Sequence, residues 1–88
     1  MTIDQIKNEL RSFIKEKFEV PDTDSDFSDD VHLFDYGYVD SFGAVELTSF
    51  VKTHFGVEIT DSDLVANPLN SINEISTFVE KRYKGSVQ

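Results

Sequence analysis

Helical periodicity at the two ends of the chain constrains its fold most strongly. Near the amino terminus, Thr2-Ile-Asp-Gln5 fits a capping box, and the apolar residues that follow recur on one helical face. We expect Val20-Pro21 to end this helix, because the residue before a proline avoids helical dihedral angles. The predicted buried face consists of Ile3, Ile6, Leu10, Phe13, Ile14 and Phe18.

A second helix is predicted from Ser41 to about Phe55. Gly56 follows it directly, and glycine is the usual residue just after the C-terminal end of a helix. Phe42 and Val45 lie roughly opposite the core side of this helix. That core side is formed by Ala44, Leu47, Val51 and Phe55.

Two further signals follow the second helix. Thr60-Asp-Ser-Asp63 indicates the start of a short third helix that ends near Pro68, and Ser71-Ile-Asn-Glu74 fits the capping box of a fourth. No β-hairpin signal is present, and Gly56-Val-Glu-Ile-Thr60 is too short to support a sheet. The fourth helix is predicted to bury Ile72, Ile75, Phe78, Val79 and Tyr83.

The expected fold is therefore all-α. It is a small antiparallel helical bundle of three main helices plus one short helix, with a long loop between helices 1 and 2. The 88 residues include no cysteine, so packing alone must stabilise the fold. We expect residues 1–84 to form a single domain and residues 85–88 to be a frayed tail.

The loop at about residues 21–39 is long and acidic. Loops of this length are uncommon in compact domains and tend to be functional or to carry structure of their own. We expect Val31, Leu33 and Phe34 to anchor it to the core.

Negative charge is concentrated in the middle of the chain. From Glu19 to Val51 there are nine carboxylates and no lysine or arginine, within a formal net charge of −9. Such a region repels nucleic acid and anionic membranes and attracts basic protein surfaces. The alternative is that these carboxylates serve solubility only.

The amino-terminal residues, Met1 to Lys7, lack the basic and apolar regions of a signal peptide. No apolar run approaches the length of a membrane span. The expected location is the cytoplasm, and the expected state is a monomer that binds neither nucleic acid nor membrane.

A calcium site is one alternative for the acidic loop, because Asp22-Thr-Asp-Ser-Asp26 matches the opening of an EF-hand loop. That loop requires glycine at position six and a bidentate glutamate at position twelve, where this chain has Phe27 and Leu33. The first departure removes the sharp turn of the loop, and the second removes the bidentate ligand for calcium. The pattern is compatible with weak, nonspecific binding of divalent cations, and it predicts no dedicated metal ligand.

Hydrolysis by Ser41 is not supported by the residues around it. No Gly-x-Ser-x-Gly elbow is present, and the only histidines are His32 and His54. His54 lies several turns further along the same helix, and His32 would need the loop to bring it close. Since a histidine cluster and a glycine-rich phosphate loop are also missing, no catalytic residue is predicted.

Ser41 has two possible roles at the start of the second helix. Serine caps helices routinely, so capping is the simplest role. If Asp40 caps instead, the Ser41 hydroxyl points outward at the positive end of the helix dipole, where a phosphate ester is favoured. Phe42 and Val45 would then form a docking surface beside it, unless the loop covers them.

The chain resembles the acyl carrier proteins, a broad family that includes peptidyl and aminoacyl carriers. The resemblance covers nearly the whole chain, with motifs in the family's order and spacing, and Phe42 stands where leucine is commoner. The matching segments are Leu33-Phe34-Asp35, Gly37, Asp40-Ser41-Phe42, Val45-Glu46-Leu47, Phe55-Gly-Val-Glu-Ile59 and Asn70-Ser-Ile72.

The resemblance implies that Ser41 carries 4′-phosphopantetheine, installed from coenzyme A by a separate phosphopantetheinyl transferase. The thiol of the arm would hold acyl or aminoacyl groups as thioesters. By the same resemblance, Asp40, Phe42, Val45 and Glu46 would dock basic and apolar patches of partner ligases or synthases. The protein itself would catalyse nothing and would act in trans.

The residues after Ser41 favour a specialised pathway. Phe42-Gly43-Ala44 departs from the common fatty-acid carriers, and Asp-Ser-Phe-Gly is similar to the motif of D-alanyl carriers and other free-standing carriers that work with adenylating ligases. Two alternatives stay open: an EF-hand-like calcium-binding module and a non-catalytic helical interaction domain.

Overall fold

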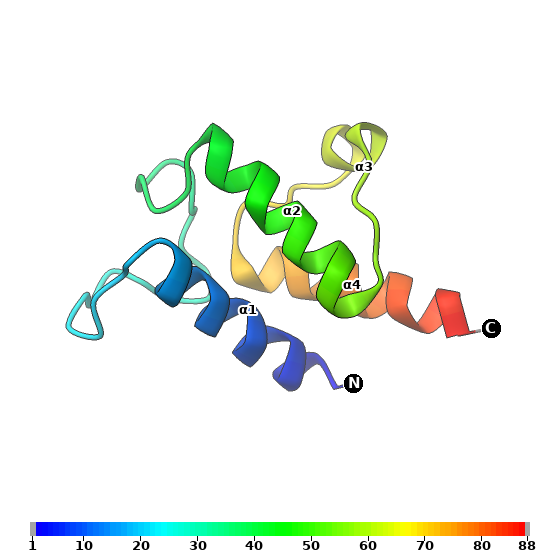
Figure 1. Ribbon diagram of the computed structural model, residues 1–88, viewed down its shortest axis with the longest axis horizontal. Coiled ribbons are helices and arrows are strands. Elements are labelled where there is room, and N and C mark those ends of the chain that lie inside the picture. Colours follow the sequence, from blue (N-terminus) through cyan, green and yellow to red (C-terminus); the bar gives the residue numbers. More distant parts are fainter. Residues whose placement is uncertain (1, 88) are drawn as a thin grey trace.

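The computed structural model describes residues 2–87, and over this range it is helical without strands (Figure 1). The predicted all-α bundle is confirmed, including its single short helix and the long loop after the first helix. α4 packs against both α1 and α2, whereas α3 lies to one side of these three (Figure 1). The helices are α1 (Ile3–Lys17), α2 (Ser41–Phe55), α3 (Asp61–Ala66) and α4 (Ile72–Val87).

One hydrophobic core lies between the three long helices. On α2, Leu47, Val51 and Phe55 are buried as predicted, and Ala44 is only partly buried. The long loop adds its own apolar residues to this core, so the chain is stabilised by packing without any disulfide. The fully buried aliphatic residues of α1 and α4 are Ile6, Leu10, Ile14, Ile72 and Val79.

The two ends of α1 differ in how well the sequence predicts them. The capping box is confirmed, because the Thr2 hydroxyl accepts a hydrogen bond from the Gln5 amide and the Gln5 side chain accepts one from the Thr2 amide. The predicted end at Val20-Pro21 is wrong, since α1 ends at Lys17. Glu19 adopts the left-handed conformation, with φ at 54°, and this reversal stops the helix before the proline can act.

Ion pairs fix the acidic loop to α1. Arg11 donates two hydrogen bonds to the Asp29 carboxylate, at 3.0 and 2.7 Å. Lys15 pairs with Asp22 at 3.1 Å. The basic residues of α1 therefore neutralise part of the loop's charge and hold it against the bundle.

Two of the three predicted loop anchors are confirmed. Val31 and Leu33 are buried in the core. The prediction for Phe34 is wrong, because its side chain is 36% exposed. Phe34 instead contributes to the rim of a surface cavity that Val45 and Leu64 also line, so its ring covers apolar surface without entering the core.

Asp63 joins α3 to α4. Its carboxylate accepts hydrogen bonds from the Thr60 amide and hydroxyl, which completes the predicted start of α3, and it pairs with Arg82 at 2.6 Å. The Thr60 amide, followed by Arg82, holds the pKa of Asp63 below its usual range. The charged carboxylate is thus the form that the fold stabilises.

Stability at low pH should depend on Asp63. The pKa of Asp63 is lower in the folded state than in the unfolded state. The contribution of the Asp63 carboxylate to the free energy of unfolding is therefore complete above about pH 4 and is lost as the pH falls through the folded pKa. We expect the difference in melting temperature between wild type and Asp63→Asn to be constant near neutral pH and to shrink in acid. Melting curves followed by circular dichroism check this, with the exposed Asp61→Asn as the control. A difference that stays the same down to about pH 2 would contradict the assignment.

The start of α4 departs from the predicted capping box in one bond. The Ser71 hydroxyl accepts from the Glu74 amide at 3.2 Å, as expected. The Glu74 carboxylate accepts from the Asn70 amide, at 3.1 Å, one residue earlier than the capping box requires. The predicted buried face is confirmed, with Ile72, Ile75, Phe78 and Val79 buried and Tyr83 partly buried.

The limits of the domain stay predictions. The boundary at residue 84 and the frayed tail at residues 85–88 are not tested by the fold, and Gln88 lies outside the described residues.

Candidate functional site

A hydrogen-bonded turn centred on Leu33 sets the position at which α2 begins. The Leu33 amide donates to the Asn70 carbonyl at 2.8 Å, just before α4. The Leu33 carbonyl accepts from the amides of Tyr38 and Val39, at 2.9 and 3.1 Å. Gly37 has a φ of 79°, a conformation that glycine adopts without strain, and it closes the turn. The loop residues before Ser41 are therefore tied to α4 and to the core.

Asp40 caps α2, and Ser41 is the first residue of the helix. The Asp40 carboxylate accepts from the Gly43 amide at 2.7 Å, and Asp40 has extended dihedral angles. Ser41 is exposed, and among the described residues its hydroxyl has no hydrogen-bond partner. The capping role that serine often has is thus filled by its neighbour, which leaves the Ser41 hydroxyl open to another molecule.

The amides at this helix start suit an anionic substituent. The Ala44 amide donates to the Asp40 carbonyl at 2.8 Å, so the amides of Ser41 and Phe42 precede the first bond of the helix. These free donors and the positive end of the helix dipole favour a phosphodiester on the adjacent hydroxyl. The residues present therefore fit a phosphate-linked group on Ser41.

Gly43 lets the first turn of α2 approach the end of α1 closely. A methyl group at Gly43 would lie 2.7 Å from Cε1 of Phe18 and 3.0 Å from Cγ1 of Val39. Gly43 is buried, and the Phe18 ring is held edge-on against Phe13. The absence of a side chain here thus positions the turn that presents Ser41, a role that sequence reasoning missed.

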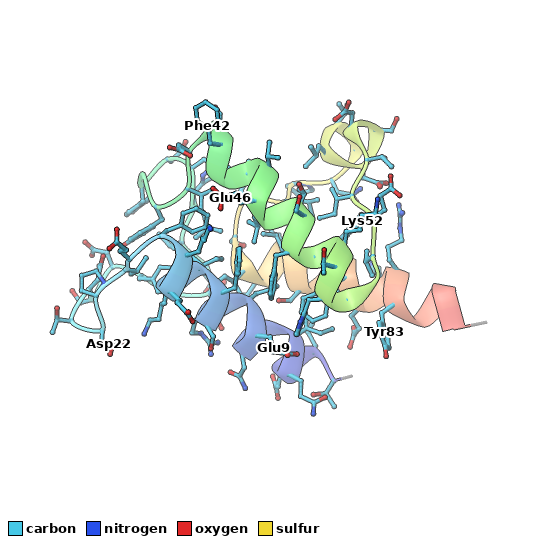
Figure 2. All side chains as sticks on the ribbon, viewed as in Figure 1. Glu9, Asp22, Phe42, Glu46, Lys52 and Tyr83 are labelled. Carbon is cyan, nitrogen blue, oxygen red and sulfur yellow. The ribbon has the colours of Figure 1, made fainter. Side chains whose placement is uncertain are left out.

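Apolar side chains are exposed on α2 just after the serine and on α3. Phe42 is 82% and Val45 is 65% exposed, so the loop does not cover them. Figure 2 shows Phe42 at the free end of α2, pointing away from the bundle. On α3, Leu64 and Val65 are exposed as well. Val45 and Leu64 border the same cavity, so these residues give this side of the molecule exposed apolar surface of the kind that partner proteins bind.

A cavity of about 190 Å³ opens between α2, α3 and α4. Val45 lines it one helical turn after Ser41, and Leu64 borders it from α3. Leu47, Leu69 and Ile75 supply further apolar lining, so a small apolar group fits this space.

Glu46 has a partner within the chain. Its carboxylate lies 2.8 Å from the Lys17 ammonium at the C-terminal end of α1, and both side chains are about half exposed. Figure 2 places Glu46 on the side of α2 that faces α1. The predicted acidic docking residue is therefore paired with a lysine that the sequence did not connect to it.

The structure places the two histidines in other interactions. His54 forms a hydrogen bond with Glu9 at 2.5 Å, and His32 accepts one from the Asp35 amide at 3.1 Å. No hydrogen bond joins either ring to Ser41 among the described residues. The arrangement shows no serine–histidine pair that would activate the Ser41 hydroxyl.

The acidic loop uses its carboxylates for structure. Asp24 accepts from the Asp26 amide at 2.9 Å and from the Tyr38 hydroxyl at 3.0 Å. Burial and this bond raise the pKa of Tyr38 to about 12, so Tyr38 stays a neutral donor. Within the described part of the chain, no group of three or more His, Cys, Asp or Glu residues is arranged to hold a metal ion.

Comparison with known proteins agrees with the resemblance. A family model described as "Phosphopantetheine attachment site" matches residues 8–79, more than half of the chain. The resemblance to the acyl carrier proteins is thereby confirmed. The expected cofactor, 4′-phosphopantetheine, is the group that this family carries covalently. Carrier domains of this kind are typically non-catalytic and interact with transferases and biosynthetic enzymes. No curated relative matches the chain.

None of the helices within residues 2–87 has the length and apolar character needed to cross a bilayer.

Proposed function

Because the chain belongs to the phosphopantetheine attachment site family, we propose that it carries acyl or aminoacyl groups as thioesters on a 4′-phosphopantetheine arm attached to Ser41. It presents these groups in trans to the enzymes of a specialised biosynthetic pathway and catalyses no reaction itself. The observation that carries this proposal is the exposed Ser41 hydroxyl, which has no partner within the described part of the chain while Asp40 caps the helix.

The chain's part in its own modification is to present an accessible oxygen. In that reaction the Ser41 oxygen would form a bond to the phosphorus next to pantetheine, a P–O bond of the coenzyme A pyrophosphate would break, and the nucleotide half would leave. The hydroxyl proton would pass to a base of the transferase, and the amides of Ser41 and Phe42 at the start of α2 would favour the negative charge of the resulting phosphodiester. Once attached, the arm would supply a thiol that holds the cargo as a thioester. The chain itself has no thiol, because it has no cysteine.

Partner enzymes dock, on this proposal, at the exposed start of α2. Phe42 and Val45 offer apolar contact, and Asp40 and Glu46 offer negative charge. The matching partners are a phosphopantetheinyl transferase and ligases or synthases with basic patches. Charge of this kind speeds encounter more than it strengthens binding, which suits a carrier that must leave each enzyme quickly.

The size of the cavity favours a short cargo. Small-molecule sites usually enclose about 300 to 1,000 Å³, and the cavity beside Val45 is smaller, at about 190 Å³. A short acyl or aminoacyl group matches this volume, which supports a dedicated carrier for short cargo.

A thiol titration tests the proposed function. The unmodified protein has no cysteine and so must give no signal with a thiol reagent. After incubation with coenzyme A and a broad-specificity phosphopantetheinyl transferase, and removal of free coenzyme A, we expect about one thiol per chain, because each chain gains one arm. Ser41→Ala is expected to stay at zero. A wild type that gains no thiol with several transferases would overturn the proposal.

A further inference from the structure

Among the described residues, three side-chain pairs join α1 to α2 in a regular series. Each helix contributes positions four residues apart, and the order reverses because the two helices run in opposite directions (Figure 1). We call this series the α1–α2 seam. Its pairs are Glu9 with His54 at 2.5 Å, Phe13 with Phe50 at a ring distance of 4.1 Å, and Lys17 with Glu46 at 2.8 Å.

The last pair of the α1–α2 seam brings a positive charge to an otherwise acidic surface. From Glu19 to Val51 the chain has no lysine or arginine, so a lysine or arginine beside Glu46 must come from outside this segment. Lys17 supplies it from the last turn of α1. The hydrogen bond to Glu46 raises the pKa of Lys17, which keeps the ammonium charged.

We propose that Lys17 competes with the basic side chains of partner enzymes for the Glu46 carboxylate, so that docking proceeds by exchange of one cation for another. This inference rests on the proposed function, because it concerns the enzymes that load and unload the arm. The docking surface then extends across the α1–α2 seam onto α1. The partner that fits it places a lysine or arginine where the Lys17 ammonium now lies.

The exposure of the pair makes the exchange feasible. Both side chains are about half exposed, so water screens their attraction and the bond is easily replaced. An exposed pair changes an equilibrium by about twofold to fivefold. Lys17 therefore lowers partner affinity modestly without preventing docking.

The variant Lys17→Gln tests the exchange by leaving Glu46 without its internal partner. We expect the kcat/KM of transferase loading to rise about twofold to fivefold, because the partner's cation no longer displaces a lysine. Glu46→Gln should load more slowly than wild type. In the Glu46→Gln background, Lys17→Gln should change nothing further, since no carboxylate is left to compete for.

Two controls separate exchange from a general charge effect. Lys15→Gln removes the same charge from the same helix, but Lys15 pairs with Asp22 and not with Glu46. Because the Glu46 carboxylate keeps its lysine partner in this variant, the loading rate should stay near the wild-type value. A benefit of Lys17→Gln that persists without the Glu46 carboxylate would show that long-range attraction alone is responsible, and would overturn the inference. Melting curves of each variant confirm that the bundle remains folded.

The outcomes also separate this inference from the proposed function. A wild type that loads normally, with Lys17→Gln unchanged or slower, overturns the exchange and leaves the carrier function intact. A wild type that no transferase loads overturns both.

Discussion

Leu33→Ala should lower the free energy of unfolding by about 2 to 5 kcal/mol, the largest loss we expect from a single change in the loop. Leu33 is fully buried although it belongs to an irregular segment. Truncation removes its contacts with the core and leaves a cavity beneath the turn that leads to Ser41. For a domain of this size, such a loss is a large fraction of the total stability.

Urea denaturation of Leu33→Ala and Leu64→Ala measures this effect with a matched control. The two substitutions remove the same atoms, but Leu64 is 49% exposed, so its loss should cost less than about 1 kcal/mol. Equal losses at the two positions would contradict the claim that Leu33 anchors the loop in the core.

Gly43→Ala should lower the free energy of unfolding by about 1 to 2 kcal/mol, although alanine favours helices more than glycine does. The new methyl group would meet the Phe18 ring at 2.7 Å and Val39 at 3.0 Å. The ring must then move from its contact with Phe13, or the first turn of α2 must shift. This cost exceeds the gain of roughly 0.5 to 1 kcal/mol in helix propensity.

A second variant identifies the cause of this loss. In a Phe18→Leu background, the ring atoms nearest to Gly43 are absent, so Gly43→Ala should cost less there than in the wild type. Urea denaturation of the two single variants and the double variant gives the coupling. An equal cost in both backgrounds would show that the Phe18 ring does not make glycine necessary at this position.

The sequence predicts the starts of the helices well, because each helix is preceded by a residue type whose side chain accepts hydrogen bonds from the first amides of that helix. Thr2, Asp40 and Thr60 act within three residues of themselves, and Gly56 ends α2 with a left-handed conformation. Such local hydrogen bonds depend on neighbours in the chain and on little else. The exposed position of Ser41 follows from the same local pattern.

Contacts between distant segments were harder to predict. The periodicity of α2 identifies its core side, but it does not reveal that Glu46 and Phe50 face α1. The repeated spacing of four residues on both helices was the available signal, and only the crossing of α1 and α2 shows which residues meet. The end of α1 at Lys17 likewise depends on the left-handed Glu19, which no residue preference indicates.

The most direct test of attachment at Ser41 is fragment mass spectrometry of the protein after transferase treatment. We expect one phosphopantetheine group per chain, located on Ser41, with Ser41→Ala unmodified. Ser49→Ala, at another exposed serine of α2, should be modified to the same extent as wild type. A group located on any other residue, or a modified Ser41→Ala, would contradict attachment at Ser41.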